Sequence, residues 1–317
     1  MRLSSKHLTL LVLLAIILLA PLGFPSNFYY RIGSLIFVNG LAVTGLVILI
    51  GFAGQISLGH AGFAGIGAYA CALGPQYLGL HPAFAMLLGT ALSAALAWLI
   101  GRPILRLQGY YLAVATLGFG ILVSMVLANE ASITGGPDGH EVPELGLRKL
   151  IETIGIHLSN AQFWYAFSGL FLLAGTWLAL NLYDSPSGRA LRALHDSEIA
   201  ARTVGVDVAR YKLFAFVLSA VYASLSGSLL ALMNKFITPD AAGFLHSVEL
   251  VTMTVLGGAG SVPGAVAGAA LLTMLPQVLT VLQDYEHMIL GLIMMLVMIF
   301  MPAGLVPSMS RLLRGRA

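Results

Sequence analysis

The sequence predicts an all-α bundle of transmembrane helices, and three observations support this. The chain has 317 residues, of which 58% are hydrophobic and only 9% are charged, whereas about a quarter of the residues in a soluble domain are charged. The mean hydropathy is +0.92. The apolar residues fall into runs of about 20, the length that crosses a bilayer core as a helix. We therefore expect one membrane domain over 1–317, embedded in lipid.

The apolar runs predict about ten spans, with eight or nine as the alternative count. The first run follows a basic start and resembles a signal peptide, but no small-residue cleavage site follows, so we expect a retained span. The region 247–276 is long for one span and short for two, and it predicts two short helices or a broken pair. Apart from that region, the predicted runs, including the first, lie near 8–24, 33–52, 60–79, 83–101, 109–129, 163–182, 211–233 and 288–306.

The distribution of basic residues predicts the orientation of these spans. With ten spans and both termini in the cytoplasm, most of the 16 lysines and arginines fall on the cytoplasmic side, as the positive-inside rule requires. The exceptions are Arg31, Arg148, Lys149 and Lys235. This topology places 184–212 in the cytoplasm and 130–162 outside.

The polar stretch 184–212 predicts a cytoplasmic helix near 187–205. Ser185-Pro186-Ser187 is typical of a helix start, and Gly205 is expected to end the helix. An amphipathic helix between spans suits docking onto a soluble partner, and a solvated connecting loop is the alternative. The expected apolar face consists of Leu191, Leu194, Ile199 and Val204.

The outer segment 130–162 opens with a turn-rich run, Thr134-Gly-Gly-Pro-Asp-Gly. Its later part, 147–158, predicts a short helix on the membrane surface. The sequence thus indicates one basic cytoplasmic segment and one mildly acidic outer segment.

The stretch 51–69 places Gln55, Ser57 and His60 among glycines near bilayer depth. Buried polar groups in a membrane face the protein interior or a wet cavity, so this stretch is a candidate lining or gate of a pathway. Close helix packing through small residues and a cytoplasmic turn are the alternatives. A weak similarity between 51–67 and 257–268 matches the paired broken helices of transporters.

Several functions are disfavoured by what the sequence lacks. No lysine follows a glycine, so there is no phosphate-binding loop, and we expect no cofactor on this chain. We find no catalytic constellation and no second ligand beside His60 for a metal. The net charge of +3 gives no nucleic-acid surface. Carboxylates within spans are scarce, which argues against a self-powered carrier; Glu249 is expected to cap a helix start.

Five stretches carry a resemblance to a known family. The sequence resembles the permease subunits of branched-chain amino acid ABC importers, the LivM/LivH family, and is most similar to the LivM type. The stretches are GFAGQISLGHAGFAGIGAYA (51–70), GYYLAVATLGFG (109–120), ITGGPDG (133–139), SGRALRALHDSEIAARTVGVDVARYKLFAFVLSA (187–220) and VLGGAGSVPGAVAGA (255–269).

The resemblance implies a subunit of the bacterial inner membrane that works with two ATP-binding subunits, a second and related permease, and a periplasmic binding protein. ATP would be bound by the partner subunits. The implied cargo is a branched-chain amino acid or a related one, with urea, amides or aromatic acids as alternatives within the family. A self-contained channel or secondary carrier is the alternative of a different class.

The resemblance also implies roles for particular residues. Part of the cytoplasmic stretch is similar to the EAA signature of importer permeases, although Ile199 replaces the first alanine and the glycine comes one residue late. The ATPase-docking candidates are Ser187, Gly188, Arg189, Arg192, Glu198, Ala200, Ala201 and Gly205. The pathway or gating candidates are Gly51, Gly54, Gln55, Ser57, Gly59, His60 and Thr116. The candidates for docking the binding protein are Thr134, Gly135, Gly136 and Asp138.

Overall fold

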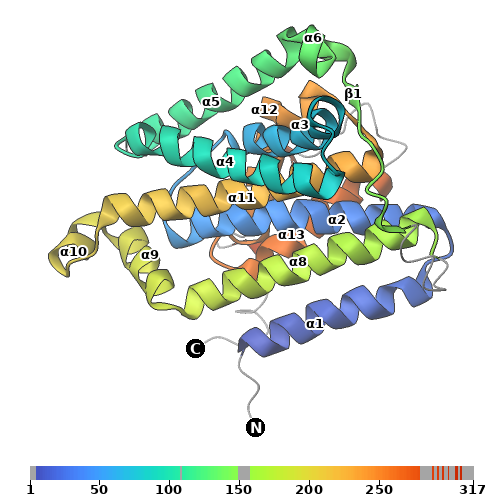
Figure 1. Cartoon of the computed structure of the whole chain (residues 1–317). Coiled ribbons are helices and arrows are strands. Elements are labelled where there is room, and N and C mark those ends of the chain that lie inside the picture. Colours follow the sequence, from blue (N-terminus) through green and yellow to red (C-terminus); the bar gives the residue numbers. More distant parts are fainter. Residues whose placement is uncertain are drawn as a thin grey trace.

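The fold is a bundle of long helices with short polar segments at its two ends (Figure 1). The computed structural model describes residues 5–107, 109–148 and 158–278, and the single later positions 288, 291, 292, 295, 299, 304, 305 and 308. Helices dominate these residues, which confirms the all-α prediction.

Among the residues that the structure describes, six apolar helices are long enough to cross a membrane. Their bounds agree with the predicted runs to within a few residues, except that the second helix begins earlier than expected. They are α1 (Ser5–Leu19) with its extension η1 (Ala20–Gly23), α2 (Asn27–Leu46) with the π-helical η2 (Val47–Phe52), α4 (Pro82–Ile104), α5 (Tyr110–Asn129), α8 (Asn160–Asp184) and α11 (Val208–Asn234).

Three further apolar helices complete the described bundle. They are α3 (His60–Leu78), α12 (Phe244–Gly257) and α13 (Val262–Val278). The pair α12 and α13 confirms that 247–276 forms two short helices, because Gly258 adopts a positive φ of 111° and ends the first of them. The expected span 288–306 lies largely outside the described residues.

Short elements gather at the ends of the bundle. One end carries α6 (Ala131–Thr134), η3 (Gly136–Asp138), η4 (Pro239–Ala242) and a two-stranded antiparallel sheet of β1 (His140–Glu141) with β2 (Phe236–Ile237). The other end carries α9 (Pro186–Asp196) and α10 (Glu198–Thr203). The helix expected at 147–158 lies mostly outside the described residues.

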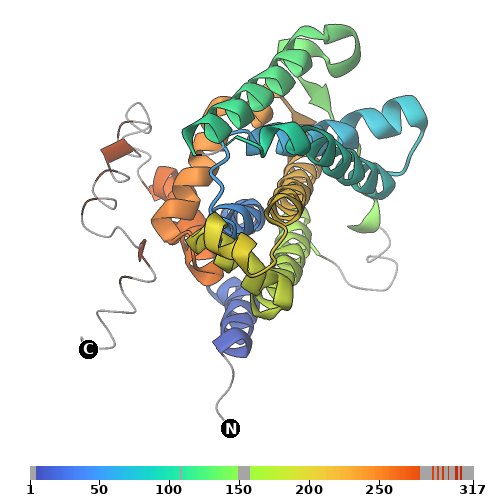
Figure 2. The same cartoon turned by 90° about the vertical axis from the view of Figure 1, so that its left-hand side faces the viewer.

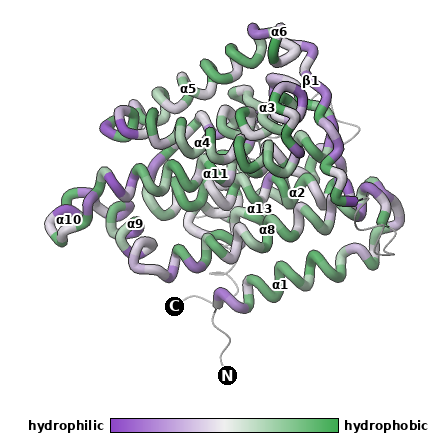
Figure 3. The backbone as a smooth tube through the Cα atoms, viewed as in Figure 1, coloured by the Kyte–Doolittle hydropathy of each residue, from purple (hydrophilic) through white to green (hydrophobic). Residues whose placement is uncertain are grey.

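The long helices α2, α8 and α11 run side by side (Figures 1 and 2), and α3 packs along α11, from His60 beside Ser219 to Gly67 beside Ser224. Hydrophobic residues cover the middle of the bundle, and hydrophilic residues concentrate at its two ends (Figure 3). Lys6, near the start of α1, donates to Asn181 Oδ1 over 2.9 Å and lies 3.9 Å from the Asp184 carboxylate. The start of α1 therefore lies at the same end as α9 and α10, as the predicted topology requires.

The close packing of α3 along α11 depends on glycines at the contact. A Cβ atom on Gly227 would overlap the backbone carbonyl oxygen of Ala64, and one on Gly67 would overlap that of Ser224. Backbone is thus packed directly against backbone, as small residues permit in membrane helices. This contact holds α3 against α11.

We expect Gly227→Ala to destabilise the protein by about 1–3 kcal/mol, because the added methyl group must displace the backbone of α3. The control is Gly118→Ala on α5, where no atom lies within 4 Å of the added Cβ and alanine is the better helix former. Thermal unfolding in detergent measures the difference. Equal melting temperatures for the two variants would contradict a close contact at Gly227.

Candidate functional site

The polar stretch 184–212 forms two helices rather than the single helix predicted near 187–205. Ser185 caps α9 by accepting from Gly188 N over 3.0 Å. Ser197 then leaves the helical conformation (φ −164°, ψ 115°) and caps α10 by accepting from Ala200 N over 3.2 Å. A serine hydroxyl offers the backbone an alternative to the helical hydrogen bond, and this explains the break. Gly205, with φ +84°, ends α10 nearly as expected.

The break divides the predicted apolar face into two parts. Leu191 and Leu194 are buried in the bundle, whereas Ile199 and Val204 are 80% and 75% exposed. The prediction of one continuous apolar face was therefore wrong, because α10 does not continue the direction of α9 (Figure 1). The result is an exposed apolar pair at the tip of the bundle, which we call the coupling tip, Ile199 and Val204.

Several of the residues predicted to dock an ATPase contact the end of α8. Arg189 Nη1 donates to Asp184 O over 3.1 Å, and Arg192 Nη1 donates to Tyr183 O over 2.7 Å. The Arg192 guanidinium also lies over the Tyr183 ring, 3.9 Å from its centroid. A Cβ on Gly188 would overlap the carbonyl oxygen of Leu182. These residues fix α9 against the end of α8, and Ser187 in the first turn of α9 is half-buried.

An ion pair joins α10 to the transmembrane helix α11. The Glu198 carboxylate pairs with the Lys212 ammonium, whose side chain is only 6% exposed, and lies 4.0 Å from Arg202 Nη2. Within α10, Ala201 lies on the buried face of the helix and Ala200 on its exposed face. A buried cation needs such a partner, so Glu198 holds α10 to the bundle.

The segment 53–59, between η2 and α3, is not helical and leads the chain back into the protein. Gln55 and Ser57 are buried, while Gly54 and Ile56, which alternate with them, are exposed. Here the hydroxyl groups of side chains accept hydrogen bonds from backbone N–H groups that have no helical carbonyl as partner. Thr116 Oγ1 accepts from Leu58 N over 3.1 Å, and Ser247 Oγ accepts from Ala61 N over 3.0 Å. The later part of the segment and the start of α3 are therefore held inside the bundle, against α5 and α12.

His60, at the start of α3, is completely buried and bridges two hydroxyl groups. Its Nδ1 lies 2.9 Å from Ser57 Oγ, and its Nε2 lies 2.7 Å from Ser219 Oγ on α11. Both ring nitrogens are thus used in holding the segment to α11. Gln55 differs, because both of its amide atoms are buried without a hydrogen-bond partner.

The glycines of this region make close backbone contacts. A Cβ on Gly51 would overlap the carbonyl oxygen of Ala259, and one on Gly59 would overlap that of Thr116. The two glycine-rich interruptions predicted from sequence therefore touch each other. All the pathway candidates except Gly54 are buried, so the geometry favours the packing interpretation for the glycines in this conformation.

Helix α9 lies directly against the re-entrant segment. Gly54 has a positive φ of 67°, and the His195 ring lies 2.9 Å from the position that a Cβ on Gly54 would occupy. The Tyr183 ring, which stacks with Arg192, lies with its centroid 5.2 Å from that of Phe52. The end of α8 and helix α9 thus contact the end of η2 and the segment after it.

The outer candidates form a tight turn. Thr134 is buried, donates to Leu127 O over 2.7 Å and accepts from Gly136 N over 3.3 Å. Gly135 and Gly136 have φ values of 79° and 60°, and Gly136 is buried. Asp138 alone among these four carries an exposed side chain, so the other three shape the turn.

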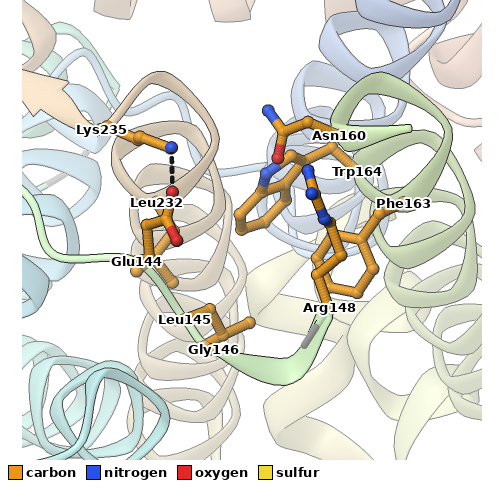
Figure 4. A pocket seen from close by; sticks show the side chains of 9 residues that line it. All are labelled: Glu144, Leu145, Gly146, Arg148, Asn160, Phe163, Trp164, Leu232 and Lys235. Atoms are coloured by element: carbon orange, nitrogen blue, oxygen red, sulfur yellow. Dashed lines mark hydrogen bonds and ion pairs between the residues drawn. The ribbon is translucent and has the colours of Figure 1, made fainter. Parts of the chain in front are cut away.

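A cavity of about 110 Å³ opens beside the outer segment (Figure 4). The Lys235–Glu144 ion pair forms one wall, and Arg148, Asn160 and Trp164 face it from the other side. Leu145, Gly146, Phe163 and Leu232 complete the lining. The cavity is therefore rich in hydrogen-bond donors, with an aromatic floor.

Glu249 does not cap a helix, contrary to the sequence prediction. Helix α12 begins at Phe244, after Gly243, so Glu249 lies in its second turn. Its carboxylate lies 3.5 Å from His246 Nδ1. His246 was not predicted from the sequence, although the spacing of three residues on a helix is a local signal. Ser219 and Ser247 were not predicted either, because their partners are distant in sequence.

Comparison with known proteins identifies the family. A profile described as "Branched-chain amino acid transport system / permease component" matches residues 28–298. The permease protein LivM of Salmonella typhimurium is 36% identical over 83% of this chain, and LivM of Escherichia coli is 33% identical over 96% of it. This chain belongs to that permease family.

The permease is of the LivM type, and it spans 66% of the Salmonella protein and 76% of the Escherichia coli protein. Similarity extends to the Salmonella LivH permease, at 26% identity over 84% of this chain and 90% of that protein. It also extends to LsrC of Yersinia pseudotuberculosis, an autoinducer 2 import system permease, at 31% identity over 59% of this chain and 53% of that protein. No solved structure matches the chain with significance.

We expect Glu198 and Lys212 of the permease to be strongly coupled. Lys212→Met alone and Glu198→Gln alone each leave one partner without its counter-charge, while the double variant leaves neither. The double variant is expected to destabilise the protein by at least about 1 kcal/mol less than the sum of the two single changes. Unfolding in detergent measures the cycle, and Arg210→Ala, at an exposed site in the same region, is the control. Additive effects of the two changes would contradict a structural ion pair.

Proposed function

We propose that this chain is the membrane-spanning subunit of an ABC importer for branched-chain or related amino acids. A periplasmic binding protein delivers the cargo, and separate ATP-binding subunits power its passage through this chain and a second, related permease. The family match and the LivM relatives support the cargo and the class. The observation that carries the mechanism is the exposed coupling tip together with the contact of the preceding helix, α9, with the segment 53–59.

The coupling tip suits an ATPase surface. Ile199 and Val204 are large, exposed apolar side chains at an end of the bundle where hydrophilic residues concentrate (Figure 3), and such patches in a polar rim are typical of protein interfaces. The contacts of Glu198, Arg189 and Arg192 within the chain give α9 and α10 a fixed position. In this proposal these residues support the docking surface, while the coupling tip makes the contact.

Movement of the ATPases would pass into the membrane along α9. His195 packs over Gly54, and Arg192 stacks on Tyr183, which packs on Phe52. A rigid shift of α9 must therefore displace the end of η2 and the segment 53–59. Rigid-body shifts of this kind are a common way to switch access between two sides.

The opposite end of the bundle suits the binding protein. The exposed Asp138 and the donor-rich cavity of Figure 4 lie there together with the two-stranded sheet. This arrangement supports a multi-pass protein of the bacterial inner membrane with 130–162 outside and both termini in the cytoplasm. The ATPase and the binding protein would then act on opposite faces.

Reconstitution tests the proposal. The complex is assembled in liposomes from this chain, the second permease, the ATPases and a purified binding protein, and uptake of labelled leucine, urea and an aromatic acid is measured with each component omitted in turn. We expect ATP-dependent leucine uptake that needs every component. Uptake by this chain alone without ATP would overturn the proposal in favour of a channel or secondary carrier.

We expect Ile199→Asp and Val204→Asp to weaken association with the ATPases about tenfold or more, because each places a charge in an apolar contact. Co-purification and titration of the ATPase measure the loss. The matched control is Ile133→Asp in α6, an exposed isoleucine at the other end of the molecule. Unchanged ATPase affinity in both coupling-tip variants would contradict the assignment.

A further inference from the structure

Glu249 is the one carboxylate that lies away from a helix end within the described apolar helices. Asp184 is the last residue of α8 and lies near Lys6. Helices α1 to α5, α11 and α13 contain no Asp or Glu. The side chain of Glu249 is 38% exposed, and that of its partner His246 is 22% exposed. An ionisable pair in such surroundings calls for a physical explanation.

The position of Ser247 fixes the depth of this pair. Ser247 contacts Ala61 at the start of α3, and the neighbouring His60 contacts Ser219 of α11. Ser219 is eleven residues beyond Val208, where α11 begins, which is about 16 Å along the helix axis. A bilayer core is about 30 Å thick. His246 and Glu249, which flank Ser247, therefore lie near the middle of the membrane.

The exposed side of the pair cannot face hydrocarbon. Charged side chains at the bilayer centre are costly and face the protein interior or water. Helix α12 buries Ser247, Leu250 and Thr254 inside the bundle and presents its other side outward, where Leu245 is 61% exposed. His246 is the one ionic partner that Glu249 has among the residues the structure describes. A surface with water beside it, at mid-membrane depth, satisfies all of these observations.

We infer that His246 and Glu249 line the passage between this chain and the second permease, and that the Glu249 carboxylate receives the ammonium group of the passing amino acid. The inference rests on the proposed function and adds a recognition site to it. The carboxylate supplies the opposite charge, and His246 holds it in place as a positioning residue. A single partly exposed carboxylate gives an attraction weak enough to release the cargo, as conduction requires.

Thiol labelling tests whether water and the Glu249 charge are present at the site. The chain has one cysteine, Cys71, which is buried and is replaced in Cys71→Ala. In that background, His246→Cys is treated in the full complex with cationic and anionic membrane-impermeant methanethiosulfonates. We expect labelling, with a preference for the cationic reagent about tenfold above that of a free thiol, since a unit charge lies beside the cysteine. Adding Glu249→Gln is expected to remove the preference.

A lipid-facing position provides the control. Leu170 on α8 is 60% exposed, and Leu170→Cys is expected to react with neither reagent, because thiols in hydrocarbon do not ionise. A His246→Cys variant as unreactive as Leu170→Cys would overturn the inference. Labelling without any dependence on Glu249 would overturn the role given to its carboxylate.

Transport by Glu249→Gln separates this inference from the proposed function. We expect leucine uptake to fall about tenfold, because the contact between the carboxylate and the ammonium group of the cargo is lost during passage. ATP hydrolysis stimulated by the loaded binding protein is expected to stay within about twofold of wild type, because the coupling end is unaltered, and Glu249→Asp is expected to recover part of the uptake. Failure of the wild-type complex to transport would overturn the proposed function itself. Normal transport by Glu249→Gln beside an active wild type would overturn this inference alone.

Discussion

The structure depends on how the backbone N–H and C=O groups find hydrogen-bond partners where the chain leaves a helix inside the membrane. Hydrocarbon offers no hydrogen bonds, so a broken helix persists only when other parts of the protein supply them. In the segment 53–59 and the first turn of α3, the hydroxyls of Thr116 and Ser247 accept from Leu58 N and Ala61 N. Glycines at 51 and 59 let the neighbouring backbone come close enough for this arrangement. The position of α3, and with it the contact to α12, follows from that constraint.

The same constraint links the two ends of the molecule. The re-entrant segment contacts α9 through Gly54 and His195, and α11 through His60 and Ser219. Helix α11 in turn holds α10 through Lys212 and Glu198. A partner that moves α9 and α10 would therefore act on both the segment and α11. The movement would then reach α12 through direct contacts, because the first turn of α3 contacts both α11 and α12.

Helix positions could be predicted from the sequence because apolar length decides them, as the close agreement for α4, α5 and α8 shows. The pair α12 and α13 was predictable because glycines interrupt the apolar run. The break at Ser197 was not predicted, since a serine inside a helical pattern caps a new helix only when tertiary contacts favour it. The burial of Thr134 and the Glu249–His246 pair also depended on three-dimensional neighbours. The segment 51–60 was recognised as unusual, but its partners Ser219 and Ser247 are distant in the chain.

The central claim is that the chain re-enters the protein at mid-membrane depth, so that α3 begins against α12. The contact between Ala61 N and Ser247 Oγ, over 3.0 Å, places the two Cα atoms within about 7 Å, a separation that a disulfide can bridge. The most direct measurement is oxidative cross-linking of Ala61→Cys with Ser247→Cys in the Cys71→Ala background, with Leu170→Cys replacing Ser247→Cys as the control pair. The account predicts an intramolecular disulfide in the first pair and none in the control. Absence of a disulfide in the first pair, in a folded protein that transports, would contradict it.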